Sequence, residues 1–133
     1  MLLDWFLAFV LTQAIEVPIY LRFCLPQPPL RSARIRFAIA FGASALTHPL
    51  LWGLLPPLWD AVGWDVVQAA GGHLDDPVAQ NVVVTTIAEI VIWIAEASWF
   101  RAFGCLRPWL WAFVANSASA GTGVLLHLTI GWP

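Results

Sequence analysis

The sequence predicts an all-α integral membrane protein built as a bundle of four transmembrane helices. Of its 133 residues, 60% are hydrophobic and only 11% are charged, whereas a soluble domain carries about 25% charged residues. Four apolar stretches approach the roughly 20 residues that one helix needs to cross a bilayer. We therefore expect one four-helix membrane domain that spans residues 1–133.

The predicted helices cover residues 2–23, 37–55, 82–103 and 110–132. The first helix carries Asp4 where a signal peptide would carry Lys or Arg, so we expect it to be retained. The long connection at 56–81 is acidic and contains tryptophans at apolar positions near helical spacing. This pattern, strongest at 59–67, predicts a short helix that lies in the membrane interface.

Arginine sets the predicted orientation, because the chain contains no lysine. All six arginines lie around the first and third connections: Arg22, Arg31, Arg34, Arg36, Arg101 and Arg107. The positive-inside rule then makes this side cytoplasmic and puts both termini and the acidic connection outside a prokaryotic inner membrane. Cys24 and Cys105 fall on the same side, where thiols stay reduced, so we expect both to be small, unreactive thiols.

The two halves of the chain resemble each other. Residues Glu16, Tyr20, Arg22, Cys24 and Pro26 recur in order as Glu96, Phe100, Arg101, Cys105 and Pro108. The segment 43–47 in the second helix is likewise echoed by 115–119 in the fourth. Since each half contains two helices, the pattern predicts a two-fold repeat about the membrane normal. Chance similarity between two apolar helices that end in arginine is the alternative.

Four ionisable residues interrupt the apolar stretches: Glu16, His48, Glu89 and Glu96. A charged side chain at the centre of a membrane helix costs about 2.5–3.5 kcal/mol on insertion scales. At 1.5 Å of helix rise per residue, their distances from the helix ends predict an inner pair, Glu16 with Glu96, and an outer pair, His48 with Glu89. Such groups need partners, protons or a function.

Neighbouring residues support the inner pair. Gln13 and Tyr20 share the helix face of Glu16, and Asn116 and Ser119 in the fourth helix can reach the same depth. Pro18 follows Glu16 by two positions, and another proline directly follows His48. Because proline interrupts the hydrogen bonds of a helix, these positions resemble ion sites at broken helices of transporters. A kinked helix held together by mutual hydrogen bonds is the structural alternative.

The favoured function is therefore a proton- or cation-handling membrane subunit. Glu16, Glu96, Glu89 and His48 would bind the ion, with Asn116, Tyr20, Gln13 and Ser119 in support. The alternative is a non-transporting accessory or assembly subunit, which would dock other membrane helices through small-residue ridges such as Ala115, Ser119 and Gly123.

An intramembrane metal-dependent enzyme ranks third among the functions. Glu89 and His48 are the best candidate metal ligands, but their spacing matches no compact metal motif. No serine or cysteine lies in an activating context, so the sequence does not favour an enzyme. The sequence requires no cofactor and does not indicate nucleic-acid binding. The expected partners are the lipid bilayer and either further copies of this chain or other membrane subunits.

Four short motifs carry a resemblance to other proteins: Glu16-x-Pro18, Leu46-Thr47-His48-Pro49, Glu96-Ala97 and Ala115-Asn116. Together they resemble a group of small prokaryotic four-helix integral membrane proteins of unassigned function. The resemblance covers most of the chain apart from the outer connection. It implies that these residues form a set, and it implies no particular reaction.

Overall fold

All regular structure in the described part of the chain is helical. The computed structural model describes residues 2–26, 32–58 and 77–132. The elements are α1 (Leu2–Ile19), the short π-helix η1 (Tyr20–Cys24), α2 (Ala33–Leu58), α4 (Pro77–Ala102) and α5 (Pro108–Ile130). The predicted all-α fold is confirmed. The interfacial helix predicted at 59–67 lies outside the described residues.

The helix ends follow from local chemistry. Both α4 and α5 begin at a proline, Pro77 and Pro108, a residue whose missing N–H has no partner in the first turn anyway. Helix α5 ends at Gly131, which adopts a left-handed φ of 66° and donates its N–H to the His127 carbonyl at 3.1 Å. Three helices start earlier than predicted: α2 at residue 33 rather than 37, α4 at 77 rather than 82 and α5 at 108 rather than 110.

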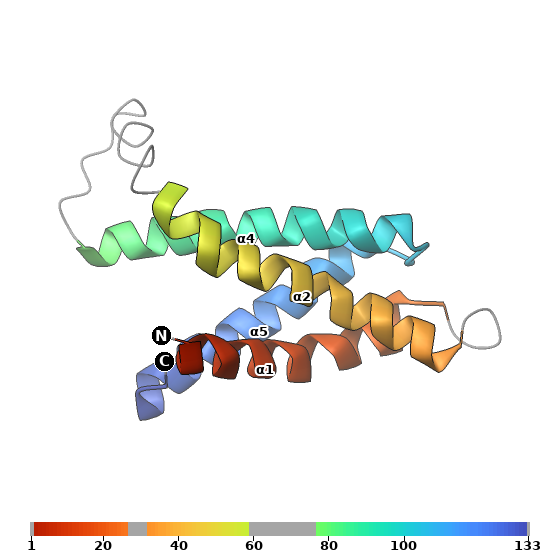
Figure 1. The fold of residues 1–133 in the computed structure, drawn as a ribbon, viewed down its shortest axis with the longest axis horizontal. Coiled ribbons are helices and arrows are strands. Elements are labelled where there is room, and N and C mark those ends of the chain that lie inside the picture. The colour runs from red at the N-terminus through yellow and green to blue at the C-terminus, as the bar shows by residue number, and fades with distance from the viewer. Residues whose placement is uncertain (1, 27–31, 59–76, 133) are drawn as a thin grey trace.

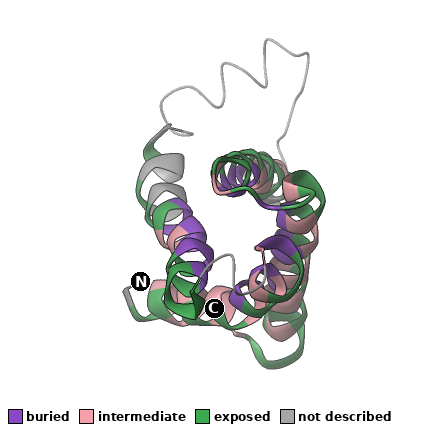
Figure 2. Ribbon diagram, turned by 90° about the vertical axis from the view of Figure 1, so that its right-hand side faces the viewer, coloured by how far each residue is buried: buried purple, intermediate pink, exposed green. Residues whose placement is uncertain are grey.

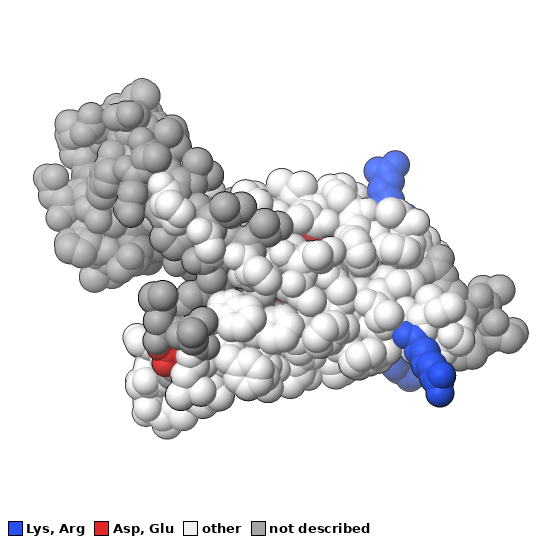
Figure 3. Space-filling model, viewed as in Figure 1, with Lys and Arg blue, Asp and Glu red and all other residues white. Residues whose placement is uncertain are grey.

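The four long helices form a ring in which each packs mainly on two neighbours. Helix α1 contacts α2 and α5, and α4 contacts the same two helices, so α1 and α4 face each other across the centre. An end-on view shows this ring with its buried residues turned inward (Figure 2). Both termini lie at one end of the bundle (Figure 1). The arginine side chains gather at the opposite end (Figure 3).

The surface of the bundle is apolar, and its interior holds polar groups among apolar ones. Within the described residues, three helical segments are long and apolar enough to cross a membrane: Leu3–Cys24, Val83–Ala102 and Pro108–Ile130. Large side chains such as Val91, Leu125 and Leu128 are 58–77% exposed, while carboxylates, hydroxyls and an amide are buried. Exposed apolar surface of this extent marks a protein that contacts lipid or other proteins. The chain therefore has the character of an integral membrane protein.

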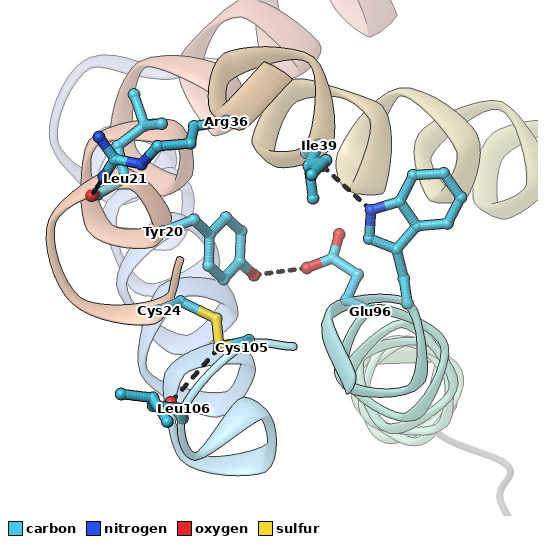
Figure 4. The surroundings of a disulfide bond; sticks show 9 residues. Tyr20, Leu21, Cys24, Arg36, Ile39, Glu96, Cys105 and Leu106 are labelled. Carbon is cyan, nitrogen blue, oxygen red and sulfur yellow. Dashed lines mark hydrogen bonds between the residues drawn. A yellow bond between two sulfur atoms is a disulfide. The ribbon is translucent and has the colours of Figure 1, made fainter. Parts of the chain in front are cut away.

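The end of the first span is a π-helical turn. The N–H of Leu25 donates to the Tyr20 carbonyl at 3.0 Å, five residues back, shortly after Pro18 inside α1. Such turns are rare and occur frequently at functional sites. The buried guanidinium of Arg36, at the start of α2, donates to the Leu21 carbonyl in this turn (Figure 4). This hydrogen bond ties α2 to η1.

The prediction of free thiols is wrong, because Cys24 and Cys105 form a disulfide (Figure 4). Their Cα atoms are 5.0 Å apart, within the range for such bonds. The N–H of Leu106 also donates to the Cys24 carbonyl at 3.1 Å. The connection between α4 and α5 is thus fixed to the end of η1 by a covalent bond and a backbone hydrogen bond.

Helices α2 and α4 approach closely at a glycine. A methyl group added to Gly42 would lie 3.3 Å from Cζ2 of Trp99, closer than ordinary van der Waals contact. The Trp99 indole cannot move freely, because its Nε1 donates to the Ile39 carbonyl at 3.0 Å. Small residues at helix interfaces allow such approach in membranes.

This contact predicts the effect of enlarging Gly42. Gly42→Val should lower the thermal unfolding temperature of the purified protein, because overpacking a fitted site costs about 1–3 kcal/mol. The matched control is Gly121→Val in α5, where an added Cβ has no neighbour within 4 Å. Equal unfolding temperatures for the two variants would contradict the packing described for α2 and α4.

Candidate functional site

Two carboxylates meet in the middle of the bundle. Glu16 projects from α1 and Glu96 from α4, on opposite sides of the ring, and each is only 1% exposed. Lipid offers neither group a hydrogen-bond donor. Their partners must therefore come from the protein or from water in a cavity.

The Glu16 carboxylate accepts one hydrogen bond at each oxygen. The Ser44 hydroxyl of α2 donates to Oε2 at 2.5 Å, and the Ser119 hydroxyl of α5 donates to Oε1 at 2.6 Å. Both serines are buried, with 0% and 9% exposure. The two helices that flank α1 thus each supply one hydroxyl to its carboxylate.

The Glu96 carboxylate has three donors. Its Oε2 accepts from the Tyr20 hydroxyl at 2.6 Å (Figure 4) and from the Asn116 amide at 2.9 Å. Its Oε1 accepts from the Thr47 hydroxyl at 3.0 Å. The Asn116 amide also donates to the carbonyl of Ala112 one turn earlier, which fixes its orientation.

The donors follow a regular pattern. In each of α2 and α5, two positions three residues apart face the centre, and each helix offers one donor to each carboxylate. All five described donors to the two carboxylates are neutral groups. Two acidic side chains are therefore held close together without a basic group among their hydrogen-bond partners.

The expected outer pair does not form. The Nε2 atom of His48 lies 3.1 Å from the Thr12 hydroxyl, and its ring packs edge-on against Phe9 at 5.4 Å. No hydrogen bond joins His48 to Glu89 in the described part of the chain. The other ring nitrogen, Nδ1, is buried without a partner. His48 and Glu89 nevertheless line the same cavity.

The central cavity has a volume of about 190 Å³ and connects these groups. Near the chain termini it is bordered by Trp132, Gly123 and Ala8. Its wall carries the outer ionisable residues, and its deeper lining includes both central carboxylates with Thr47, Asn116 and Ser119. A volume of this size has room for several waters. The cavity, lined by polar and apolar groups, thus extends from residues near the terminal end of the bundle to the central carboxylates.

Buried groups of the described chain lie between the central carboxylates and the arginine end of the bundle. The rings of Tyr20 and Phe100 are 0% exposed and lie 4.1 Å apart between centroids. Closer to this end lies the disulfide between Cys24 and Cys105. Two fully buried rings and a covalent bridge therefore separate the central carboxylates from this side.

Sequence reasoning missed part of the network. Ser44, Thr47 and Thr12 contact the ionisable residues but were not predicted to support the site. The predicted support residue Gln13 lies elsewhere, with its amide 3.4 Å from the Phe41 carbonyl. The one available signal was the echo between segments 43–47 and 115–119, because it aligns Ser44 with Asn116 and Thr47 with Ser119.

No cluster of three or more potential metal-ligating residues occurs in the described ranges. The candidate ligands His48 and Glu89 border a common cavity without a third ligand of this kind beside them. The residues present are therefore a poor match for zinc, which is usually bound by at least three protein ligands.

Comparisons with known proteins give no further guide. No protein-family model, no curated protein and no solved structure matches this chain. The chemistry of the site must therefore be argued from its own geometry.

The hydroxyl pattern predicts a stability effect. Ser44→Ala and Ser119→Ala should each destabilise the protein, because each removes an interhelical hydrogen bond of about 0.6–2 kcal/mol and leaves a buried carboxylate oxygen unpaired. Thermal unfolding in detergent measures the loss. Ser98→Ala is the matched control, since that exposed hydroxyl bonds only to Ile94 of its own helix, at 2.7 Å. A control loss as large as that of Ser44→Ala would contradict this role.

Proposed function

We propose that this protein is a proton- or cation-handling membrane subunit whose binding site is the pair Glu16 and Glu96. The observation that carries the proposal is the polar cavity that leads from the terminal end of the bundle to both carboxylates. The ion enters this cavity, passes His48 and Glu89 on its wall and binds at the floor. Structural hydrogen bonding alone gives no reason for such a path.

The charge of the site supports the same conclusion. Two carboxylates that lie close together rarely remain ionised side by side. The hydroxyls of Ser44, Ser119, Thr47 and Tyr20 and the amide of Asn116 stabilise negative charge but do not cancel it. The pair therefore shares a proton or binds a cation, and exchange of that ion with the cavity is the proposed activity.

A two-fold repeat, with α2 as a fourth span, accounts for the symmetry of the donors. Under the alignment of 43–47 with 115–119, Ser44 corresponds to Asn116 and Thr47 to Ser119. Ser44 and Asn116 each donate to the carboxylate of their own half, while Thr47 and Ser119 each donate to that of the other half. Chance similarity between apolar helices does not explain this exchange of partners.

The axis of this repeat would pass between Tyr20 and Phe100, near the arginine end of the bundle. Tyr20 and Phe100 correspond in the alignment and touch each other, as do Cys24 and Cys105, which are bonded. Equivalent residues beside a two-fold axis must be neighbours. At this pair the two halves differ by one hydroxyl group: Tyr20 donates its hydroxyl to Glu96, and Phe100 has none. The two carboxylates therefore differ in affinity for the ion.

Passage to the arginine end requires the aromatic pair to move. The Tyr20 hydroxyl is the donor to Glu96 on that side, so protonation of the carboxylate weakens this bond. We propose that loss or gain of the ion at Glu96 controls the position of the Tyr20 ring. The accessory-subunit alternative assigns no such change to the site.

The central prediction concerns ion exchange. Glu16→Gln and Glu96→Gln should keep the protein folded, because the amide preserves shape and most hydrogen-bonding capacity. Both should abolish proton or cation flux in liposomes, because an amide does not exchange a proton at accessible pH. Asp4→Asn, which removes a carboxylate near the N-terminus, is the control and should retain flux. Absence of flux in the wild-type protein, alone or with co-purified partners, would support the accessory role instead.

Orientation gives a separate prediction. We propose that both termini face outward, because the arginines set orientation during insertion. The disulfide at the arginine end then faces the cytoplasm, where such bonds are rare. A periplasm-dependent reporter fused after Pro133 should be active, and a cytoplasm-dependent one inactive. The reverse pattern would put the disulfide on the oxidising side and invert the proposed direction of the cavity.

A further inference from the structure

A second cavity lies on the side of the bundle, in the seam between α4 and α5. It has a volume of about 380 Å³, within the usual range of about 300–1,000 Å³ for small-molecule sites. Exposed residues such as Ile90 and Phe113 border it, so it opens on the apolar surface of the bundle. We call it the lateral groove; it is lined by Thr85, Thr86, Glu89, Ile90, Trp93, Phe113, Asn116, Ser117 and Ala120.

The lateral groove adjoins the central cavity. Glu89, Asn116 and Ala120 line both spaces. The Glu89 carboxylate is half-buried at this junction, and no described side chain hydrogen-bonds to it. An acidic group to which no described side chain donates a hydrogen bond, at the junction of an apolar groove and the central cavity, has the features of a ligand anchor.

The repeat explains why this seam is open. In the corresponding seam between α1 and α2, the rings of Phe9 and His48 pack edge-on with 5.4 Å between their centroids. The alignment of the two halves puts Glu89 at the position of Phe9 and Ala120 at the position of His48. Two rings on one side of the bundle are thus replaced by a carboxylate and a methyl group on the other.

The walls of the lateral groove are fixed before any ligand binds. The indole Nε1 of Trp93 donates to the Trp109 carbonyl at 2.8 Å, and the Trp93 ring contacts Phe113 edge-on at 5.8 Å. A preformed wall lowers the entropic cost of binding an alkyl chain.

Charge selects the head group of the ligand. Among the described residues, the lining of the two cavities includes three carboxylates and no arginine, and His48 is the one residue there that could carry positive charge. An anionic head is therefore repelled, while an ammonium group can donate to Glu89. Because the groove opens on the membrane-facing surface, its ligand comes from the bilayer and carries an apolar chain.

We propose that the lateral groove binds an alkyl amphiphile with a primary ammonium head, which enters between α4 and α5 and anchors at Glu89. This inference uses the proposed repeat but does not depend on ion exchange at the central carboxylates. The ammonium lies at the junction, and the chain extends along Ile90, Trp93 and Phe113 toward lipid.

Photolabelling tests the proposal. The full-length protein in nanodiscs is exposed to dodecylamine that carries a diazirine on its chain, and labelled peptides are mapped by mass spectrometry. Labelling should concentrate in 85–93 and 113–120, and unlabelled dodecylamine should compete for it. The same chain with a carboxylate head should label these segments no more than the rest of the lipid-facing surface.

Two variants separate the head-group site from the groove. Glu89→Gln should weaken competition by dodecylamine about tenfold, because a hydrogen bond to a charged group is lost. Ala120→Leu should abolish competition by filling the junction, while Ala95→Leu, the same change at an exposed position of α4, should not. Thermal unfolding of each variant shows that it is folded.

Three outcomes would overturn the proposal. They are uniform labelling of all helices, equal labelling by the carboxylate probe, and a photoreactive residue at position 117 that captures another membrane protein without competition from dodecylamine. The last result would assign the groove to a partner helix. If Glu96→Gln loses flux but is labelled as before, amphiphile binding in the lateral groove stands. If the wild-type protein shows normal flux but no labelling, amphiphile binding is rejected and the proposed ion exchange stands.

Discussion

The structure depends on hydrogen bonds to two buried carboxylates, because the lipid around the bundle offers no hydrogen-bond donor. Glu16 and Glu96 are met by five neutral donors from α2, α5 and η1. This requirement fixes the rotation of each helix about its axis, because Ser44 and Thr47 must face the centre together. Small residues such as Ala40 and Ala115, both fully buried, then allow the backbones to approach.

Much of the fold could be predicted from the sequence, because spanning a bilayer imposes a length and an apolar composition that few other structures share. The four intramembrane ionisable residues were equally visible, since each interrupts an apolar run. Their partners were harder to find. A serine or threonine in an apolar helix bonds its own backbone as readily as a distant carboxylate, as Ser98 does with Ile94. The three-dimensional packing shows which of the two serines reaches a carboxylate: Ser44 does and Ser98 does not.

Two expectations were wrong, each for a different reason. His48 and Glu89 were paired by depth, but His48 turns toward Thr12 and Phe9 in the adjacent α1. The depth of a residue along a helix does not specify the direction in which its side chain points around the helix axis. The free thiols were expected from the compartment, but the predicted repeat would make Cys24 and Cys105 equivalent. Equivalent residues near a two-fold axis would lie close together, which agrees better with the disulfide.

The disulfide also changes the topology of the polypeptide itself. It joins residues 81 positions apart and thereby closes more than half of the chain into a covalent ring that contains α2 and α4. A protease that cuts once between residues 25 and 104 leaves two fragments that stay attached through the sulfur bridge. They migrate as one species until a thiol reductant is added. Nicking the chain within this ring therefore does not release its halves.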